Sequence, residues 1–412
     1  MTEPGDNGSA SGFSRRRLLL GGAAIGGSAA LVGAAAGAAV ATSVNQRDQQ
    51  PGDSGTGALG ESTVDPYGPH QAGIATPAQA SAAIASFSLR PGSSRTDLVK
   101  LMKLLSDDIE RLAAGEPALA DPVPELAAVP ANLTVTVGFG PGVFSLDGLA
   151  PYRPEWLVDL PVFAGDEIDP AFTGGDILVQ ICSDDPLTVG HTLRVVSNDA
   201  AAFTTTRWIQ QGFHNAPGAL PSGTVGRNLF GQVDGIVNPT PGTADFDEVV
   251  WSDAPAWLVG GTGMVVRRVE FELETWTQLD RAGREEIIGR NLSDGAPLSG
   301  GTPESQVDLD AVDERGLSVI APTAHARLAA PTNPRERILR RPYNFGTGVA
   351  GDAGQIFVAF AADPAEQFVG IQRRLAESDL LNTWVTYTGS AIAAVPPGFS
   401  PGGWIGETLL EA

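Results

Sequence analysis

The sequence has few of the residues that build disulfides and metal centres. Only one cysteine, Cys182, occurs in 412 residues. No disulfide can therefore form within the chain, and a zinc site made of several cysteines is excluded. Cys182 ends an apolar run, which predicts a small buried side chain. The chain also has only four histidines, so any histidine-dependent site must use one of His70, His191, His214 and His325.

Positive charge is scarce as well. Lys and Arg total 26 against 48 Asp and Glu, and the formal net charge is -22. Such a surface repels phosphate backbones, so we expect no nucleic acid among the partners. It also repels anionic lipid. The hydrophobic fraction of 42% is ordinary for a folded protein and is sufficient for a core.

Residues 1–41 indicate a targeting segment. Arg15, Arg16 and Arg17 stand directly before a Gly/Ala-rich apolar run that ends near Ala41, an order typical of a signal peptide. The paired arginines favour the twin-arginine route, which exports folded proteins. The alternative is an uncleaved membrane anchor, because the run is just long enough to span. We expect cleavage, no stable membrane span afterwards, and a periplasmic, cell-envelope or extracellular location.

Residues 42–66 are polar and predict a disordered linker. From residue 67 onward the pattern becomes globular. Apolar alternation and helical periodicity predict an order of elements that occurs twice. The first copy has strands 83–89, 133–139 and 176–182 with helices 97–112 and 186–196, and the second has strands 263–271 and 355–360 with helices 275–288 and 364–375.

The two copies share a local signature. Strands 177–182 and 356–360 are each followed by Asp and Pro, which cap and start a helix. This repeat predicts an α+β fold of two ferredoxin-like modules, each β-α-β-β-α-β with an antiparallel sheet, as in dimeric α+β barrels. We place the N-terminal module at 67–222 and the C-terminal module at 223–412.

The second module contains an unusual acidic loop. Asp234 stands between glycines in Gly231-Gln232-Val233-Asp234-Gly235, and His325 and Arg340 follow later in the chain. Taken alone, the glycine-flanked Asp is better explained as a turn. A lone histidine such as His325, after an apolar approach, is more often a core residue than a ligand. An acid, a histidine and an arginine in this order suggest haem peroxide chemistry.

The surrounding motifs resemble the signature of dye-decolourising (DyP-type) haem peroxidases of the exported branch. The resemblance runs from about Tyr67 to the C-terminus, and the motifs occur in the family's order. They are Tyr67-Gly68-x-His70-Gln71-x-Gly73-Ile74, Arg227-Asn228-Leu229 before Gly231-x-x-Asp234-Gly235, Gly260-Gly261-Thr262, His325-x-Arg327-Leu328-Ala329, Leu339-Arg340-Arg341, Gln367-Phe368-x-x-Ile371-Gln372 and Gly389-Ser390-Ala391.

The resemblance implies a haem b cofactor and three roles. His325 would be the proximal iron ligand. Asp234 would move a proton between the two oxygens of hydrogen peroxide, and Arg340 would stabilise the charge that develops on them. Because thioether attachment of haem requires a Cys-x-x-Cys-His motif, which this chain lacks, the haem would be held without covalent links.

The resemblance also implies the residues around the haem. Gly235, Ile236 and Val237 would lie against its distal face, and Ala330, Pro331 and Thr332 would line the proximal side. Three further assignments have open alternatives. Arg227 would reach a haem propionate or only brace its loop. Asp379 would accept a hydrogen bond from His325 or is a solvated acid at a helix end. Finally, the aromatic residues Trp276, Trp384 and Tyr387 are candidates for relaying electrons, or simply pack in the core.

Three functions follow from these observations. The first is an exported peroxidase that uses hydrogen peroxide to oxidise dyes, phenolic compounds or similar one-electron donors. The second is a deferrochelatase-like protein that handles haem or iron together with components of an iron-uptake system. The third is a haem-free interaction module on the same fold. A homo-oligomer is compatible with each of them.

Overall fold

The computed structural model describes residues 58–221, 223–346 and 352–412. The expected signal segment 1–41 and residues 42–57 of the expected linker lie outside these ranges. Across the described ranges, no helix is both long enough and apolar enough to cross a membrane.

The N-terminal module is ferredoxin-like. Its sheet has the order β4-β1-β3-β2, and all neighbouring strands are antiparallel. The chain follows the predicted β-α-β-β-α-β order, with β1 (Ser81–Leu89), α1 (Arg95–Ala113), β2 (Thr134–Phe139), β3 (Ile177–Ser183), α2 (Pro186–Ala200) and β4 (Thr204–Phe213).

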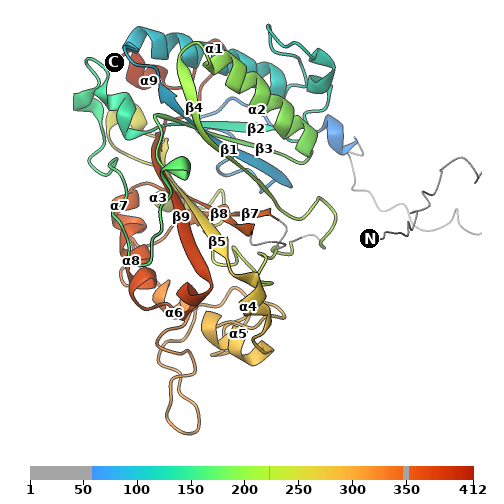
Figure 1. Ribbon diagram of the computed structural model, residues 1–412, viewed down its shortest axis with the longest axis vertical. Coiled ribbons are helices and arrows are strands. Elements are labelled where there is room, and N and C mark those ends of the chain that lie inside the picture. The colour runs from blue at the N-terminus through green and yellow to red at the C-terminus, as the bar shows by residue number, and fades with distance from the viewer. Residues whose placement is uncertain (1–57, 222, 347–351) are drawn as a thin grey trace, which may run out of the picture. The chain divides into compact units, whose positions relative to one another are not determined.

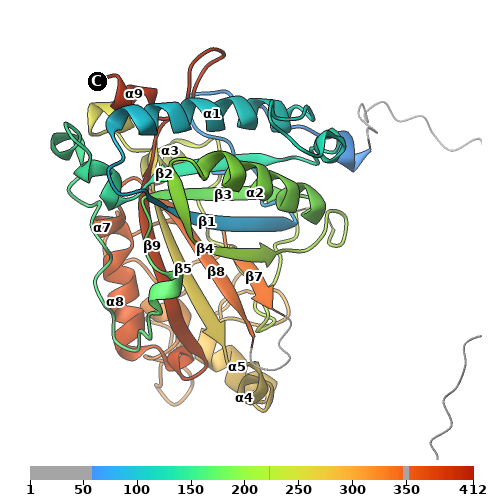
Figure 2. The same ribbon diagram turned by 45° about the horizontal axis from the view of Figure 1, so that its top comes forward.

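Helices α1 and α2 lie side by side over one face of this sheet (Figure 2). The α1 helix starts at a capping box, in which Ser94 and Asp97 each bond the other's backbone N–H. Its apolar stripe packs on the sheet because its buried residues recur at helical spacing: Leu98, Leu101, Met102, Leu105, Ile109 and Leu112. The α2 helix starts with Asp185 as its N-cap and Pro186 in its first turn, as predicted.

The C-terminal module repeats this topology. Its sheet order β9-β5-β8-β7 matches the order β4-β1-β3-β2 of the first module. Its strands are β5 (Thr262–Phe271), β6 (Leu339–Arg340), β7 (Tyr343–Gly346), β8 (Ala353–Ala361) and β9 (Val385–Val395), and its helices are α4 (Leu273–Thr277), α5 (Arg281–Ile288), α6 (His325–Leu328), α7 (Pro364–Gln367) and α8 (Val369–Ser378).

The two sheets join at both edges and close into a ring of strands (Figure 1). At one junction Phe139 of β2 pairs with Ala394 of β9, and at the other Phe213 of β4 pairs with Asn344 of β7. Apolar side chains from both sheets fill the interior, among them Ile84, Leu178, Met264, Tyr343, Ile356 and Phe360. The predicted fold class is therefore confirmed: α+β, two ferredoxin-like modules, antiparallel sheets and barrel closure.

Two predicted helices are each broken in two. The helix predicted at 275–288 is interrupted between α4 and α5, because the Asp280 side chain caps a new helix by accepting the Gly283 N–H at 2.8 Å. The helix predicted at 364–375 is divided at Phe368, whose ring is buried in the core.

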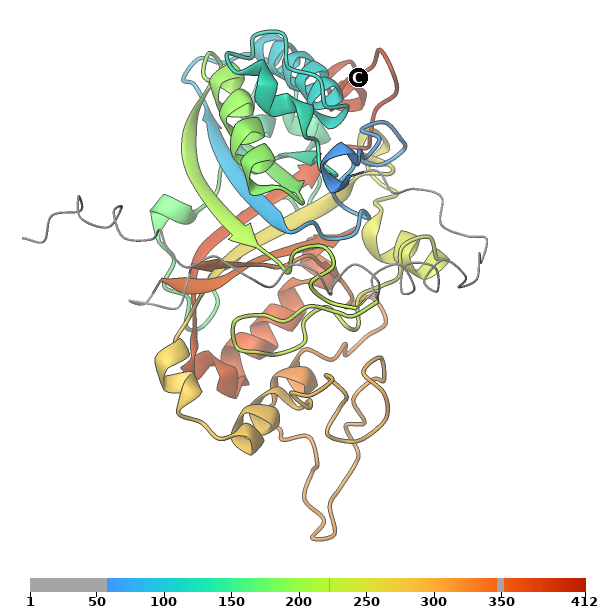
Figure 3. The same ribbon diagram turned by 90° about the vertical axis from the view of Figure 1, so that its right-hand side faces the viewer.

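The remaining elements are short. Residues 289–324, between α5 and α6, contain no helix or strand and extend away from the strands (Figure 3). Two more helices are α3 (Ala244–Val250) and α9 (Glu407–Leu410). Single 3-10 turns occur at Leu59–Glu61, Pro124–Ala128, Pro141–Ser145, Ala150–Tyr152, Pro170–Phe172, Ala256–Leu258 and Leu380–Thr383.

Candidate active site

A cavity of about 280 Å³ lies on the outer face of the C-terminal sheet. On β8, Ile356 and Val358 point into the ring of strands, whereas the alternating residues Gln355 and Phe357 line the cavity. Val269 on β5 pairs with Gln355, Tyr387 on β9 pairs with Val269, and both line the cavity. Helices α6 and α8 contribute the opposite side. In the N-terminal module the corresponding face is covered directly by α1 and α2.

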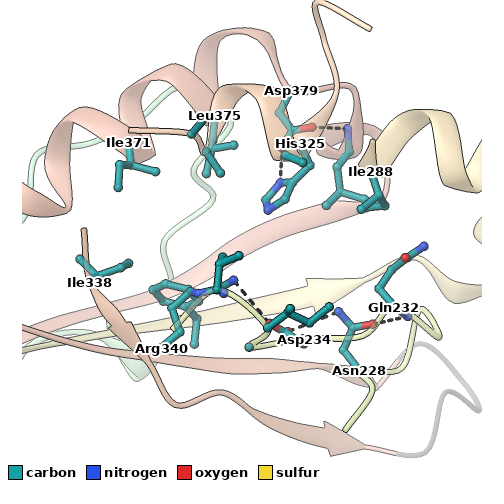
Figure 4. A pocket seen from close by; sticks show the side chains of 18 of the residues that line it. Asn228, Gln232, Asp234, Ile288, His325, Ile338, Arg340, Ile371, Leu375 and Asp379 are labelled. Carbon is teal, nitrogen blue, oxygen red and sulfur yellow. Dashed lines mark hydrogen bonds and ion pairs between the residues drawn. The ribbon is translucent and has the colours of Figure 1, made fainter. Parts of the chain in front are cut away.

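His325 lies on the helical side of the cavity, at the first position of α6 (Figure 4). Its Nδ1 is 2.6 Å from Oδ2 of Asp379, which is only 6% exposed and follows the last residue of α8. Asp379 Oδ1 accepts the Leu381 N–H at 2.9 Å, which fixes the carboxylate. Because Nδ1 is occupied, Nε2 is the ring nitrogen that remains free to bind a ligand.

The electrostatic setting of His325 has opposing contributions. Burial lowers the pKa of His325, but the negative charge of Asp379 and its hydrogen bond raise it, and the net shift is upward. Asp379 therefore holds the imidazole in one orientation and enriches its electron density. Both effects are typical of histidines that ligate metals.

Asp234 lies on the other side of the cavity, together with Arg340 (Figure 4). Asp234 Oδ1 is 3.6 Å from Arg340 Nη1, and its Oδ2 accepts a hydrogen bond from Gln355 Nε2 at 2.8 Å. Gly231 and Gly235 have φ values of 83° and 105°, in the left-handed region that glycine adopts without strain. The Gly-x-x-Asp-Gly run is thus a turn, and this turn presents an acid to a cavity.

Two residues that support this arrangement were missed in the sequence. Asn238 clamps the Arg340 backbone: its Nδ2 donates to the Arg340 carbonyl at 2.7 Å, and its Oδ1 accepts the Arg340 N–H at 3.1 Å. Gln355 holds Oδ2 of Asp234. The only signal for Asn238 was its place in a Gly-rich loop before a proline. A glutamine within an apolar strand was the only signal for Gln355.

Most residues expected around the haem line the cavity, namely Gly235, Ile236, Val237, Ala330 and Pro331, along with Asp234, His325, Arg340 and Asp379.

Arg227 and Thr332 do not line the cavity. The Arg227 guanidinium donates to the carbonyls of Gly231, Leu292 and Ser293, so it braces its loop. Thr332 is turned toward Glu336, whose Oε2 accepts both its N–H and its hydroxyl at 2.9 Å. These contacts agree with the second alternative for Arg227, a brace for its loop, and neither residue lines the cavity in which the cofactor is expected.

The other three histidines lie outside the cavity lining. His191 is buried, and its Nε2 is 2.9 Å from Asp121 Oδ2. His70 stacks on Trp251 with ring centroids 3.7 Å apart. His214 is half-buried, with its ring centroid 5.9 Å from that of Tyr343. Cys182 is buried as predicted.

Aromatic rings connect the cavity to the protein surface. Phe230 lines the cavity, and its ring centroid is 4.6 Å from that of buried Trp276. Trp276 in turn lies 5.4 Å from Trp384, which is partly exposed. Tyr387 lines the cavity itself. The three aromatic candidates therefore group around this site, although Trp276 also packs as a core residue.

The cavity residues fit a haem. His325 faces Asp234 and Arg340 across the cavity. The walls between them are rich in apolar residues, such as Ile288, Phe357 and Leu375. Within the described ranges, no group of three or more His, Cys, Asp or Glu could hold a bare metal ion. A single histidine is sufficient when the metal is already held by a macrocycle. Two buried amide nitrogens in the lining, Nε2 of Gln232 and Nε2 of Gln372, also have no partner among the described residues.

Two family models match this chain, the N-terminal model of Dyp-type peroxidases over residues 71–214 and the C-terminal model over 225–400. A dye-decolorizing peroxidase from Thermobifida fusca is 35% identical over 361 residues, which cover 83% of this chain and 84% of the relative. A deferrochelatase from Shigella flexneri is 33% identical over 370 residues, covering 84% and 87%.

The similarity extends to solved structures. The oxyferrous complex of DtpA from Streptomyces lividans is 41% identical, with a TM-score of 0.82, and the match covers 86% of this chain and 99% of the other. The matched ranges include both modules and the cavity. The protein therefore belongs to the DyP-type peroxidase family and is a haem-dependent peroxidase.

Proposed function

We propose that this protein is an exported haem b peroxidase that uses hydrogen peroxide to oxidise dyes, phenolic compounds or similar one-electron donors. The observation that carries the proposal is the opposition of His325 to Asp234 and Arg340 across one cavity (Figure 4). A ligand for iron and the groups that handle protons and charge thus share one enclosed space.

Haem bound in this cavity supplies an iron that reacts with peroxide and passes the oxidising equivalents to donors. Asp234 is the proposed proton carrier. Its Oδ1, on the side of Arg340, accepts a proton from one peroxide oxygen and delivers it to the other, which leaves as water. Gln355 holds Oδ2, so the carboxylate keeps one orientation during the transfer.

Arg340 is the proposed source of positive charge. Its planar guanidinium cation would stabilise negative charge on the separating oxygens. The Asn238 clamp on the Arg340 backbone fixes the starting point of this long side chain. Positioning of this kind matters because electrostatic stabilisation depends on groups that need not reorganise during the reaction.

His325 is the proposed iron ligand, bound through Nε2. Asp379 would accept a hydrogen bond from the other ring nitrogen, Nδ1, at 2.6 Å and so make the imidazole a more electron-rich ligand. Gly235, Ile236 and Val237 would contact the haem on the Asp234 side, and Ala330 and Pro331 on the His325 side, because all five line the cavity.

Bulky donors cannot enter a cavity that a haem fills. We propose that they are oxidised at the surface through the row Phe230, Trp276 and Trp384, whose neighbouring ring centroids are 4.6 Å and 5.4 Å apart. Small donors would reach the cavity directly. Export by the twin-arginine route belongs to the same proposal, because a protein that folds around a cofactor before export needs a route for folded proteins.

The alternative function is deferrochelatase activity, in which iron is released from haem. It is favoured by one observation, the 33% identity to a relative of that name. Peroxide-dependent dye turnover and iron release from haem, measured on the same purified holoprotein, separate the two functions. Turnover with intact porphyrin iron supports the peroxidase. Iron release without dye turnover would replace it with the alternative.

The residue assignments have their own test. The variants Asp234→Asn and Arg340→Leu should retain haem and lose most of their peroxide-dependent turnover. If either variant keeps full turnover with full haem content, its assigned role is wrong.

A further inference from the structure

Arg290 is a cavity-lining cation with no acidic partner. Three arginines line the cavity: Arg337 pairs with Asp245, Arg340 faces Asp234, and Arg290 lies next to α5. The Arg290 guanidinium donates only to backbone carbonyls, those of Gly295 at 2.8 Å, Pro303 at 3.0 Å and Ser305 at 3.1 Å. Over the residues that the structure describes, no carboxylate comes within ion-pair distance of it.

The charge on Arg290 is therefore uncompensated. Burial lowers the pKa of Arg290, and the positive charge of Arg340 lowers it further. A guanidinium nevertheless stays protonated in proteins. A half-buried cation beside a second cation, bonded only to neutral carbonyls, is stabilised when an anion binds next to it.

The cavity lining also contains an amide that has no partner among the described residues. Gln232 is 6% exposed, it lines the cavity, and its buried Nε2 has no partner among the described residues. Its backbone is held on both sides by Asn228, whose Oδ1 accepts the Gln232 N–H at 3.2 Å and whose N–H donates to the Gln232 carbonyl at 3.0 Å. The position of this side chain is thus set by a clamped turn.

The loop whose carbonyls bond Arg290 packs against the turn that carries Gln232. A Cβ placed on Gly295, whose carbonyl bonds Arg290, would lie 2.3 Å from Ile236 Cδ1 and 3.1 Å from Val233 Cβ. Val233 directly follows Gln232 in the chain. In Figure 4, Gln232 and Ile288, which lies two residues before Arg290, are at the same end of the cavity.

We propose that Arg290 and Gln232 form a carboxylate subsite that binds a propionate of the haem. The subsite supplies one full positive charge and two sets of N–H donors at the polar end of an apolar cavity, which matches the chemistry of a macrocycle with carboxylate side chains. It takes the role that the sequence suggested for Arg227, which, unlike Arg290, does not line the cavity. The inference rests on the proposed binding of haem at His325.

Haem loss from the holoprotein tests the subsite without any activity measurement. The rate of haem transfer to excess apomyoglobin should rise about ten- to a hundredfold in Arg290→Gln, the effect of losing one charged hydrogen-bonded contact. It should rise about three- to tenfold in Gln232→Leu, which removes a neutral donor. Arg290→Lys keeps the charge and should lose haem more slowly than Arg290→Gln.

Matched controls come from exposed positions outside the cavity lining. Arg315→Gln and Gln278→Leu change the same residue types at the surface, and both should lose haem at the wild-type rate. A control that loses haem as fast as Arg290→Gln would mean that the effect is not local, which overturns the proposal.

Haem dimethyl ester separates a contact with the propionate from a purely structural effect. The ester has no carboxylate anion, so wild type and Arg290→Gln reconstituted with it should lose it at equal rates. If the difference between them persists with the ester, Arg290 only supports the fold and the proposal is wrong. A raised KM for a sulfonated dye, with unchanged haem loss, would assign the subsite to an anionic substrate and also overturn it.

A failure of the carboxylate subsite can be distinguished from a failure of the proposed haem peroxidase function. If wild-type protein holds haem, and His325→Ala abolishes that binding, then haem loss at the wild-type rate in both subsite variants refutes only the subsite. If wild-type protein binds no haem, the proposed function fails first.

Discussion

Each module contains a histidine next to a buried aspartate, and the two histidines differ in the space around them. In the N-terminal module His191 Nε2 lies 2.9 Å from Asp121 Oδ2, and both side chains are almost fully enclosed. In the C-terminal module His325 Nδ1 lies 2.6 Å from Asp379 Oδ2, but the histidine side chain is 33% exposed and lines a cavity. A histidine–aspartate pair therefore becomes a candidate ligand only where the second ring nitrogen has open space.

The surroundings of the two pairs explain the difference. In the N-terminal module α1 and α2 are continuous and press directly on the sheet. In the C-terminal module both corresponding helices are broken, and the cavity lies between α8 and the sheet. The same topology thus gives a solid core in one half and a cavity in the other.

The largest expected effect contrasts the acids of the two modules. Asp234→Asn removes the proposed proton carrier and should slow the reaction with peroxide about 10²- to 10⁴-fold, with haem content unchanged. Asp121→Asn removes the acid of the enclosed pair and should leave this rate unchanged. Stopped-flow mixing of each holoprotein with peroxide measures both rates. Equal rates in the two variants would remove the functional distinction between the modules.

A smaller effect is expected at Asp379. Asp379→Asn keeps the size of the side chain but removes the negative charge beside His325 Nδ1. Loss of such a partner costs about 10- to 100-fold in activity or metal affinity. The haem midpoint potential should also rise, because a less electron-rich ligand stabilises ferric iron less well. An unchanged potential in a spectroelectrochemical titration would show that Asp379 has only a packing role.

The surface route through Trp384 predicts an effect that depends on the donor. Trp384→Phe should reduce turnover of a bulky dye several-fold and leave turnover of a small phenol unchanged. Trp156→Phe, in the core of the N-terminal module, is the matched control and should affect neither donor. Steady-state rates with both donors give the answer, and an equal loss for both donors would argue against a separate surface route.

The last prediction concerns Asp108, a buried acid of the N-terminal module. We expect it to affect the stability of the fold and not the activity. Burial, followed by a hydrogen bond to Asp199 and its charge, raises the pKa of Asp108 to about 8. Between the ordinary carboxyl range and about pH 8, the folded state keeps a proton that the unfolded chain releases. The free energy of unfolding should therefore fall as pH rises through this window.

The variant Asp108→Asn tests whether Asp108 causes this fall in the free energy of unfolding. The amide cannot ionise, so the part of the pH dependence that comes from Asp108 should disappear from urea unfolding curves measured between pH 5 and pH 8.5, the range spanned by the shifted pKa. Peroxide turnover should not change. A variant that keeps the wild-type slope of stability against pH would show that Asp108 is not the titrating group.

Local sequence patterns were sufficient for most of the fold. Strand alternation and Asp-Pro helix starts predicted β1, β2, β3, β5 and β8 and the helices beside them, because these signals act over a few residues. The last strand of each module, β4 and β9, and the short strands β6 and β7 were not predicted. The breaks at Asp280 and Phe368 were missed because each depends on one side chain that interrupts an otherwise continuous periodicity. Strand β6, two residues long, is defined only by its pairing with β8.

The site could be predicted where a motif carried it. Asp234, His325 and Arg340 stood in motifs of a known family, and the structure brings them to one cavity. Gln355, Asn238 and Arg290 could not be found in this way, because their roles depend on contacts between segments far apart in the chain. The motif left two roles open for Arg227, and its hydrogen bonds to the carbonyls of Gly231, Leu292 and Ser293 agree with the brace of a loop.

The central claim is that one of two similar histidine–aspartate pairs binds the haem iron. The most direct test is the absorption spectrum and haem content of purified His325→Ala beside His191→Ala. The account predicts that His325→Ala loses the Soret band of the His-ligated haem, whereas His191→Ala keeps it and is only less stable to unfolding. A wild-type Soret band in His325→Ala, or its loss in a folded His191→Ala, would contradict the account.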